Sequence, residues 1–189
     1  MNKGILLFTS VFLALIVTTN LTVRFAQTRW DGAAMIGVAS TAITLALVFY
    51  TIGVFAERRS GTLTASHLIF FYLGLACDTA GTAAMSMIAQ GESASPAHAA
   101  TGLLAIILMI VHAAWATIAY AKKNPETLSR FHRLSIGVWL VWLVPYVCGM
   151  FMGIPALKLD SNVAFASAIA TSVVAGLLIF GAKAKRLRR

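Results

Sequence analysis

Charged residues are scarce in this sequence, making up 11% of its 189 residues, whereas a soluble domain carries roughly 25%. Hydrophobic residues account for 59% of the chain, and its mean hydropathy is +0.85. So few polar side chains cannot cover a water-exposed surface of this size. These values exclude a soluble fold, and with it a nucleic-acid-binding domain built on surface lysine and arginine.

Cysteine and proline are also rare, with two and four residues respectively. Cys77 and Cys148 both fall inside apolar runs, where a cysteine behaves as a small buried hydrophobe. The sequence contains no HExxH, CxxC, GxSxG, GxGxxG or phosphate-binding loop motif, so nothing in it indicates an enzyme.

What the sequence has instead is a series of apolar runs, each long enough to cross a bilayer as a helix of about 20 residues. Turn-forming pairs such as Asp31-Gly32 and Asn124-Pro125 separate them. We predict an all-α integral membrane bundle of six transmembrane helices in a single domain, with sequential helices antiparallel because their connections are short. The predicted spans are 4–23, 33–56, 64–90, 97–121, 129–153 and 163–182.

The distribution of lysine and arginine predicts the orientation of these spans. If the N-terminus is inside, twelve of the fifteen basic residues lie in inner segments, and only Arg24, Arg29 and Lys158 lie outside. Such an excess marks the cytoplasmic side of a membrane protein. We therefore expect both termini to be cytoplasmic. Residues 1–23 lack a small-residue cleavage site, so a retained helix is expected there rather than a signal peptide.

Four histidines and one aspartate fall within the predicted spans, where ionisable groups are costly and are candidates for function. They are His67, His98, His112, His132 and Asp78. A histidine near a helix end can also lie in the lipid headgroup layer, and this alternative applies to His67, His98 and His132. His112 lies deep within an apolar run and needs a partner there.

The spacing of these residues places them on two helix faces. His98 and His112 are fourteen residues apart, on one side of a helix and roughly 21 Å apart along it. His67 and Asp78 are eleven residues apart and also share a face. Such polar stripes, relieved by small residues, are typical of a cofactor site inside a bundle. The accompanying residues are Gly102, Ala105, Ala116 and Ala119 on the first face, and Gly74 and Thr82 on the second.

A haem held by two histidines needs both ligands at similar depth on facing helices. His67 and His132 lie about one turn from the predicted cytoplasmic ends of their spans, and His112 lies roughly 13 Å from that end. These three can supply a pair, whereas His98 at the outer end has no histidine partner. A methionine is the alternative ligand for His98, and the candidates are Met85, Met87, Met150 and Met152.

Asp78 and the remaining donors leave other readings open. The Asp78 carboxyl group can accept a hydrogen bond from Thr79, Thr82 or a histidine, or it can take part in a proton relay. A zinc site fits less well, because its ligands must converge and the depths of these residues scatter. Pro145 is expected to kink the fifth span, which either opens space for a ligand or shapes the packing.

Four stretches of the chain carry a family resemblance. They are 44–57 (TLALVFYTIGVFAE), 67–85 (HLIFFYLGLACDTAGTAAM), 98–119 (HAATGLLAIILMIVHAAWATIA) and 131–153 (FHRLSIGVWLVWLVPYVCGMFMG). Together they resemble the HsmA-like family of small bacterial multi-pass membrane proteins, and the similarity covers residues 43–153, about sixty per cent of the chain. The resemblance implies a bacterial inner-membrane protein and a four-helix core, to which this chain adds a helix at each end. It also implies histidines at the positions of His67, His98, His112 and His132, and the family name implies a link with haem.

Three functions follow as hypotheses. The first is binding of haem b for electron transfer or haem sensing, in the manner of cytochrome b-type bundles, with one haem expected rather than two. The second is a non-catalytic accessory subunit of a larger membrane complex, since small-residue helices suit lateral packing. The third is a small transporter or proton pathway through Asp78 and the histidines. The haem ligands of the first hypothesis are His67, His112, His132 and His98.

Overall fold

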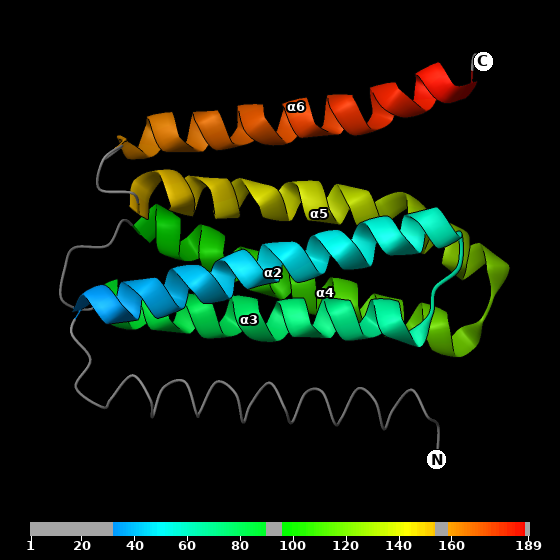
Figure 1. Cartoon of the computed structure of the whole chain (residues 1–189), viewed down its shortest axis with the longest axis horizontal. Helices are drawn as coiled ribbons and strands as arrows, with labels where there is room; N and C mark the ends of the chain where they lie inside the picture. Colours follow the sequence, from blue (N-terminus) through cyan, green and yellow to red (C-terminus); the bar gives the residue numbers. More distant parts are fainter. Residues whose placement is uncertain (1–31, 90–95, 154–158, 188–189) are drawn as a thin grey trace. The chain divides into compact units, whose positions relative to one another are not determined.

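The structure is a computed structural model that describes residues 32–89, 96–153 and 159–187, with only the backbone given for residues 32, 33, 89, 96–98, 153 and 182–187. Within these ranges the chain is all-α, as predicted, and contains no strand. The predicted span 4–23 lies outside the described residues, so five of the six predicted helices are confirmed. The five helices are α2 (Gly32–Ser60), α3 (Ala65–Ala89), α4 (Pro96–Lys122), α5 (Pro125–Gly153) and α6 (Ser161–Leu187) (Figure 1).

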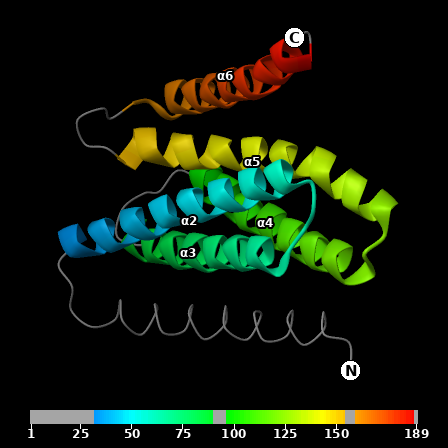
Figure 2. The ribbon, with the colours of Figure 1, turned by 45° about the vertical axis from the view of Figure 1, so that its right-hand side comes forward.

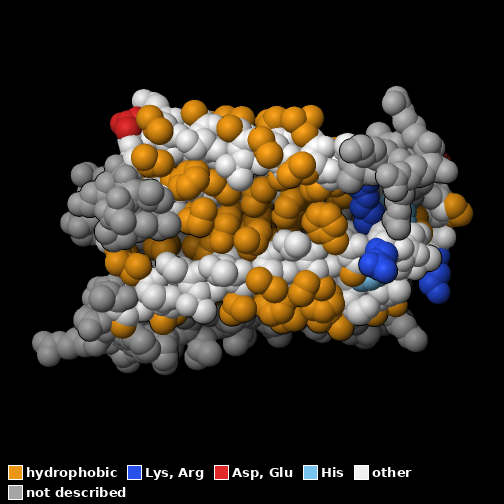
Figure 3. Space-filling model, turned by 45° about the horizontal axis from the view of Figure 1, so that its top comes forward, with side chains coloured by type: hydrophobic (Ala, Val, Ile, Leu, Met, Phe, Trp, Pro, Cys, Tyr) orange, Lys and Arg blue, Asp and Glu red, His pale blue; other side chains and the backbone are white. Residues whose placement is uncertain are grey.

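All five helices are long and apolar enough to cross a membrane. Large hydrophobic side chains remain exposed along them, and Leu104, Val141 and Leu177 are 64%, 60% and 68% exposed. Figure 3 shows such side chains spread along the surface, with lysine and arginine gathered near one end. Surfaces this apolar are unfavourable in water and suit the hydrocarbon of a bilayer. The described helices are therefore those of a membrane protein.

Local sequence explains where the helices begin and end. After α2, Gly61 adopts a φ of 65° and its N–H donates to the Glu57 carbonyl at 3.1 Å, which closes the helix in the left-handed conformation that glycine allows. Before α5, the Asn124 side chain accepts a hydrogen bond from the Glu126 N–H at 2.9 Å, and Pro125 takes the first helical position. This cap starts α5 four residues before the predicted start at residue 129.

Helix α3 lies against both α2 and α4, and its contact with α2 is the more extensive (Figure 2). Two glycines make the α2–α3 contact close. The Tyr50 ring of α2 lies directly over Gly74 of α3, and the Phe71 ring of α3 lies over Gly53 of α2, where a methyl group would be only 2.7 Å from it. Because glycine has no side chain, the aromatic rings reach the facing backbone and the two helices approach closely.

The chain forms two compact units, residues 1–136 and 137–189. The first contains α2, α3, α4 and the beginning of α5, and the second contains the rest of α5 and α6. In the second unit the Ser172 hydroxyl of α6 donates to the Leu140 carbonyl of α5 at 2.7 Å. Helix α5 runs through Pro145 to its end as one element. The described side chains of the predicted histidine and aspartate candidates all belong to the first unit.

Candidate functional site

The candidate site lies at the end of the first unit where basic residues gather. Within about 15 Å of this end along the helix axes, four helices each contribute one buried or half-buried ionisable side chain: Glu57 from α2, His67 from α3, His112 from α4 and His132 from α5. We call these four residues the histidine–glutamate cluster. All six lysine and arginine side chains that the structure describes belong to the segments at this end, and they are Arg58, Arg59, Lys122, Lys123, Arg130 and Arg133.

Glu57 and His132 are in direct contact, through the carboxylate Oε1 and the ring Nδ1. The Glu57 side chain is fully buried and that of His132 is 23% exposed. Within the described residues, the ring Nε2 of His132 and the second carboxylate oxygen of Glu57 are buried and have no hydrogen-bond partner. A carboxylate on one ring nitrogen, with the other nitrogen left free, is how proteins orient a histidine that binds a metal.

Glu57 is not among the residues predicted from the sequence. It directly precedes Arg58 and Arg59, and a run of charged residues after an apolar run is typical of the end of a span. The sequence feature that identifies Glu57 is its spacing from the apolar residues before it, because residues three or four positions apart lie on one face of a helix. Four fully buried residues of α2 follow these steps, and they are Ala46, Tyr50, Val54 and Glu57.

His67 is held differently from the other two described histidines. Its Nδ1 accepts a hydrogen bond from the backbone N–H of Thr64 at 3.2 Å, and the Thr64 hydroxyl lies at the same distance. Thr64 directly precedes α3 and His67 is its third residue, which is the relation between the two partners of a helix capping box. An accepting Nδ1 places the hydrogen of the neutral ring on Nε2. His67 therefore caps α3, and its Nε2 is a donor in that state.

His112 is the deepest of the histidines, only 2% exposed and ten residues, or about 15 Å, from the end of α4. The ring centroids of Phe71 and Phe131 lie 4.9 Å and 5.1 Å from its own, and the Phe131 ring is stacked on it at 24°. Neither nitrogen of His112 has a hydrogen-bond partner within the described part of the chain. Its predicted burial is confirmed, and no described side chain supplies the partner that a buried imidazole requires.

His112 and His132 lie at similar depth in the first unit. Phe131 stacks on His112, and His132 is the next residue of α5, a rise of about 1.5 Å along the helix. The imidazoles of His112 on α4 and His132 on α5, whose buried nitrogens lack a partner among the described residues, therefore lie at similar heights along the two helices. Among the described residues, no three His, Cys, Asp or Glu side chains gather closely enough to hold a bare metal ion.

Asp78 lies apart from the histidine–glutamate cluster, near the middle of α3. Its side chain is 4% exposed and interacts with the phenol group of Tyr50, which is fully buried on α2. The predicted burial of the face that carries His67 and Asp78 is confirmed. Thr79, one of the expected partners, instead donates its hydroxyl to the Leu75 carbonyl at 2.7 Å. Tyr50 was missed because an aromatic residue in an apolar run resembles ordinary packing.

The remaining predicted site residue, His98, lies in the first turn of α4, and its side chain falls outside the described part of the structure. Its proposed pairing with a methionine therefore stays a prediction. Of the small residues predicted on the same face of α4, Ala105, Ala116 and Ala119 are buried, at 7%, 0% and 0% exposed, and Gly102 is half-buried. That face is directed inward, as its spacing predicted.

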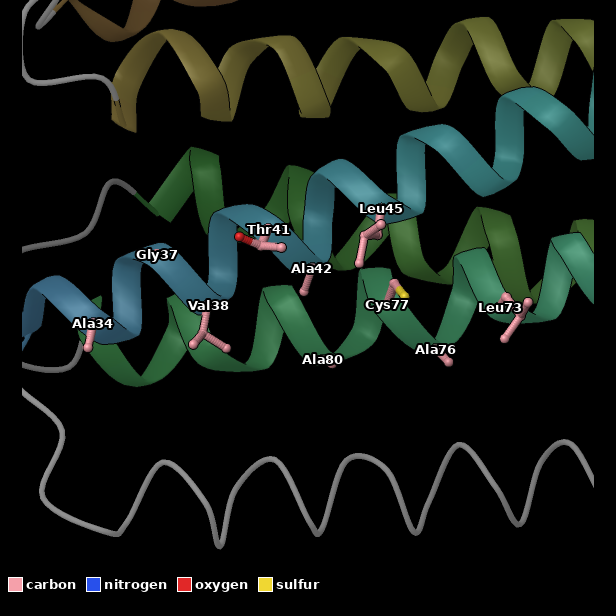
Figure 4. Close-up of a pocket in the computed structure, with 10 residues that line it drawn as sticks. All are labelled: Ala34, Gly37, Val38, Thr41, Ala42, Leu45, Leu73, Ala76, Cys77 and Ala80. Atoms are coloured by element: carbon pink, nitrogen blue, oxygen red, sulfur yellow. The ribbon is translucent and has the colours of Figure 1, made fainter.

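An apolar groove of about 670 Å³ lies along the first half of α2 and the middle of α3 (Figure 4). No charged side chain lines it. Its residues nearest to the histidine–glutamate cluster are Leu45 on α2, twelve residues or about 18 Å from Glu57, and Leu73 on α3, six residues or about 9 Å from His67. No residue of the cluster lines the groove. Small residues form most of its wall, and they include Ala34, Gly37, Ala42, Ala76 and Ala80.

No protein-family model, curated protein or solved structure matches this chain. The described helices are those of an all-α membrane protein. Two histidines, His112 and His132, keep buried ring nitrogens that no other described residue engages, and a buried glutamate orients one of them.

Proposed function

We propose that this chain is a haem-binding membrane protein that transfers electrons or senses haem, and that His112 and His132 hold the iron of haem b. The observation that carries the proposal is the side chain of His112. It is 2% exposed, and neither ring nitrogen has a hydrogen-bond partner among the described residues. Leaving a buried polar group unpaired costs about 1–3 kcal/mol. Bound haem iron would give an imidazole nitrogen of His112 the partner it lacks.

His132 supports the proposal as the second ligand. Glu57 engages its Nδ1 and leaves Nε2 free and buried. A carboxylate in this position fixes the orientation of the imidazole and increases its basicity, which strengthens binding to a metal through the other nitrogen. His67 is the less suitable ligand because its Nδ1 accepts a hydrogen bond from the Thr64 N–H, which leaves the ring hydrogen on Nε2 and no free lone pair on that nitrogen.

The surroundings of His112 also suit haem, which needs an apolar pocket. Phe71 and Phe131 lie against the imidazole, and the Trp115 ring meets Phe131 edge-on at 6.1 Å. A porphyrin reaches the His112 nitrogen only after the two phenyl rings move aside. When bound, haem supplies one-electron chemistry, and these side chains keep water from it while the two histidines hold their nitrogens in place.

The proposal also places the protein in the cell. It includes membership of the HsmA-like family, a bacterial inner membrane, and cytoplasmic positions for both termini and for the basic end. The support for this orientation is the excess of basic residues, twelve of fifteen, in segments assigned to one side. All six described basic side chains also belong to segments at the end that carries the histidine–glutamate cluster.

A haem titration of the purified full-length protein in detergent tests this function. We expect a saturable Soret band, and at least about tenfold weaker binding in His112→Ala and His132→Ala, because each variant loses an axial ligand. Glu57→Gln is expected to weaken binding about 10-fold to 100-fold, the usual effect of losing the group that orients a ligand. His67→Asn is the matched control, since it removes a buried histidine but keeps an acceptor for the Thr64 N–H.

Two outcomes of this titration contradict the proposal. One is the absence of a saturable Soret band, and the other is wild-type affinity in His112→Ala. A protein that binds no haem but is isolated with a stoichiometric membrane-protein partner would instead favour the accessory-subunit hypothesis.

A further inference from the structure

We propose that the apolar groove on α2 and α3 is the docking site of the chain's own predicted first span, residues 4–23. The occupant is thus a segment that lies outside the described residues and leads directly into α2. No residue of the histidine–glutamate cluster lines the groove, so the inference is independent of haem binding.

The groove is built from one face of each helix. The residues of α2 that line it are spaced three or four positions apart or adjacent, between Ala34 and Leu45, and those of α3 lie between Leu73 and Ala80. Every lining residue is half-buried or exposed, and Val38, Leu45 and Leu73 are 41%, 43% and 42% exposed. Figure 4 shows the lining residues in a row along both helices. The groove is therefore an outward-facing surface that another element can cover.

The wall of the groove suits the close approach of another membrane helix. Six of its ten lining residues are glycine, alanine or threonine. Within a bilayer, helices associate mainly through close packing, and residues of this size allow two backbones to come near each other. The predicted span 4–23 contains no charged residue, so it meets the uncharged groove without burying a charge. An apolar transmembrane segment is therefore the kind of partner that this surface fits.

The place of the span in the sequence brings it to this groove. Only residues 24–31 separate it from α2, which begins at Gly32 and lines the groove from Ala34 onward. An extended connection of this length reaches about 26–29 Å, whereas the axes of packed helices are about 8–10 Å apart. The span can therefore turn back antiparallel to α2. Its length of about 30 Å exceeds the roughly 16 Å of α2 that the groove occupies.

Attachment to α2 favours this segment over a second copy of the chain. A segment held by so short a connection has an effective concentration at its site on the order of 1 mM. A separate molecule reaches the groove only by encounter, and it loses its own translational and rotational freedom on binding. The attached segment therefore occupies the groove first, and a second copy enters only by displacing it.

Disulfide cross-linking to Cys77 tests the docking, because this native thiol lines the groove. Cys148→Ala removes the other cysteine, and single cysteines are then introduced in turn at residues 4–23 of the full-length protein in lipid vesicles. A disulfide forms only where two α carbons approach within about 7 Å. We expect links within one chain, at positions three or four residues apart, since one face of the span meets the groove. Mass spectrometry of the monomer identifies them, and a linked dimer migrates at twice the mass.

The antiparallel arrangement also predicts which positions react. Cys77 lies between two contacts of α3 with α2, at Gly74 and Gly81, and is therefore close to the level of Leu45. Leu45 is thirteen residues beyond the start of α2, so a span that turns back beside α2 reaches this level about thirteen residues before its own end, close to Ser10. Cross-linking within about four residues of Ser10 is expected to be at least about tenfold faster than at either end of the span.

Ile36→Cys, in a chain that also carries Cys77→Ala and Cys148→Ala, is the matched control. Ile36 is 46% exposed and belongs to the same stretch of α2, but it is nine residues from Leu45 and therefore lies on the opposite side of the helix. Cysteines at residues 4–23 are expected to link to this position at least about tenfold more slowly than to Cys77. Circular dichroism identifies any variant that has lost its helices.

Three results would overturn the proposal. The first is the absence of any link between residues 4–23 and Cys77 in folded protein. The second is a disulfide-linked dimer as the only product, which would assign the groove to a second copy. The third is cross-linking to Ile36→Cys as fast as to Cys77, which would show that the span has no preference for the groove.

Discussion

Gly74→Ala is the substitution for which the structure gives the clearest energetic expectation. A methyl group at this position would overlap Cδ1 and Cε1 of the fully buried Tyr50 ring. Because the ring is enclosed between two packed helices, the strain has to be absorbed by a shift of the ring or of the helices. Overpacking of this kind costs about 1–3 kcal/mol.

Gly37→Ala is the matched control, because a methyl group there would have no atom within 4 Å apart from its own helix and neighbours. Both substitutions gain the same helix propensity, about 1 kcal/mol in soluble helices. The difference between the two variants therefore isolates the cost of overpacking. We expect Gly74→Ala to be about 1–3 kcal/mol less stable than Gly37→Ala.

Reversible unfolding of the full-length protein in detergent, followed by circular dichroism, measures this difference. A Tyr50→Leu background gives a second check, because the smaller side chain should remove most of the penalty at position 74. Equal stability of Gly74→Ala and Gly37→Ala, or an undiminished penalty in the Tyr50→Leu background, would refute the close α2–α3 contact.

Three further predictions follow from other contacts. Breaking the buried pair with Glu57→Ala should lower stability by about 3–5 kcal/mol; if denaturation experiments show Glu57→Ala as stable as wild type, His132 does not depend on this carboxylate. Tyr72→Phe should cost about 0.5–1.5 kcal/mol through the loss of its hydrogen bond to Thr117, and the cost should vanish when the same measurement is made in a Thr117→Val background. Lys123→Gly should raise the unfolding temperature, because Lys123 has a φ of 50° that costs a non-glycine residue about 1–2 kcal/mol; a lower unfolding temperature would contradict this.

The positions of the helices and their inward faces were predictable from the sequence because they depend on length and periodicity alone. Five predicted spans agree with the observed helices, and the stripes containing His67, Asp78 and His112 are buried. The start of α5 was displaced by a local cap, in which Asn124 and Pro125 begin a helix before its apolar run begins. Such displacement is expected where capping and hydrophobicity act at different residues.

The partners of the polar residues were not predictable in the same way. Periodicity gives the face on which a side chain lies, but not the residue of another helix that meets it. Tyr50 is the partner of Asp78 because α2 packs against α3, and Glu57 is the partner of His132 because the same helix meets the start of α5. The role of His67 was hidden for a different reason, since the sequence identifies a histidine but not which of its nitrogens a neighbouring N–H occupies.

The electron paramagnetic resonance spectrum of the ferric haem complex tests the central claim most directly, because its spin state reports the axial ligands. The account predicts a low-spin spectrum for wild-type protein and for His67→Asn, and conversion to high spin in both His112→Ala and His132→Ala as one imidazole is lost. A high-spin wild-type complex, or a low-spin spectrum unchanged in both alanine variants, would contradict ligation by these two histidines.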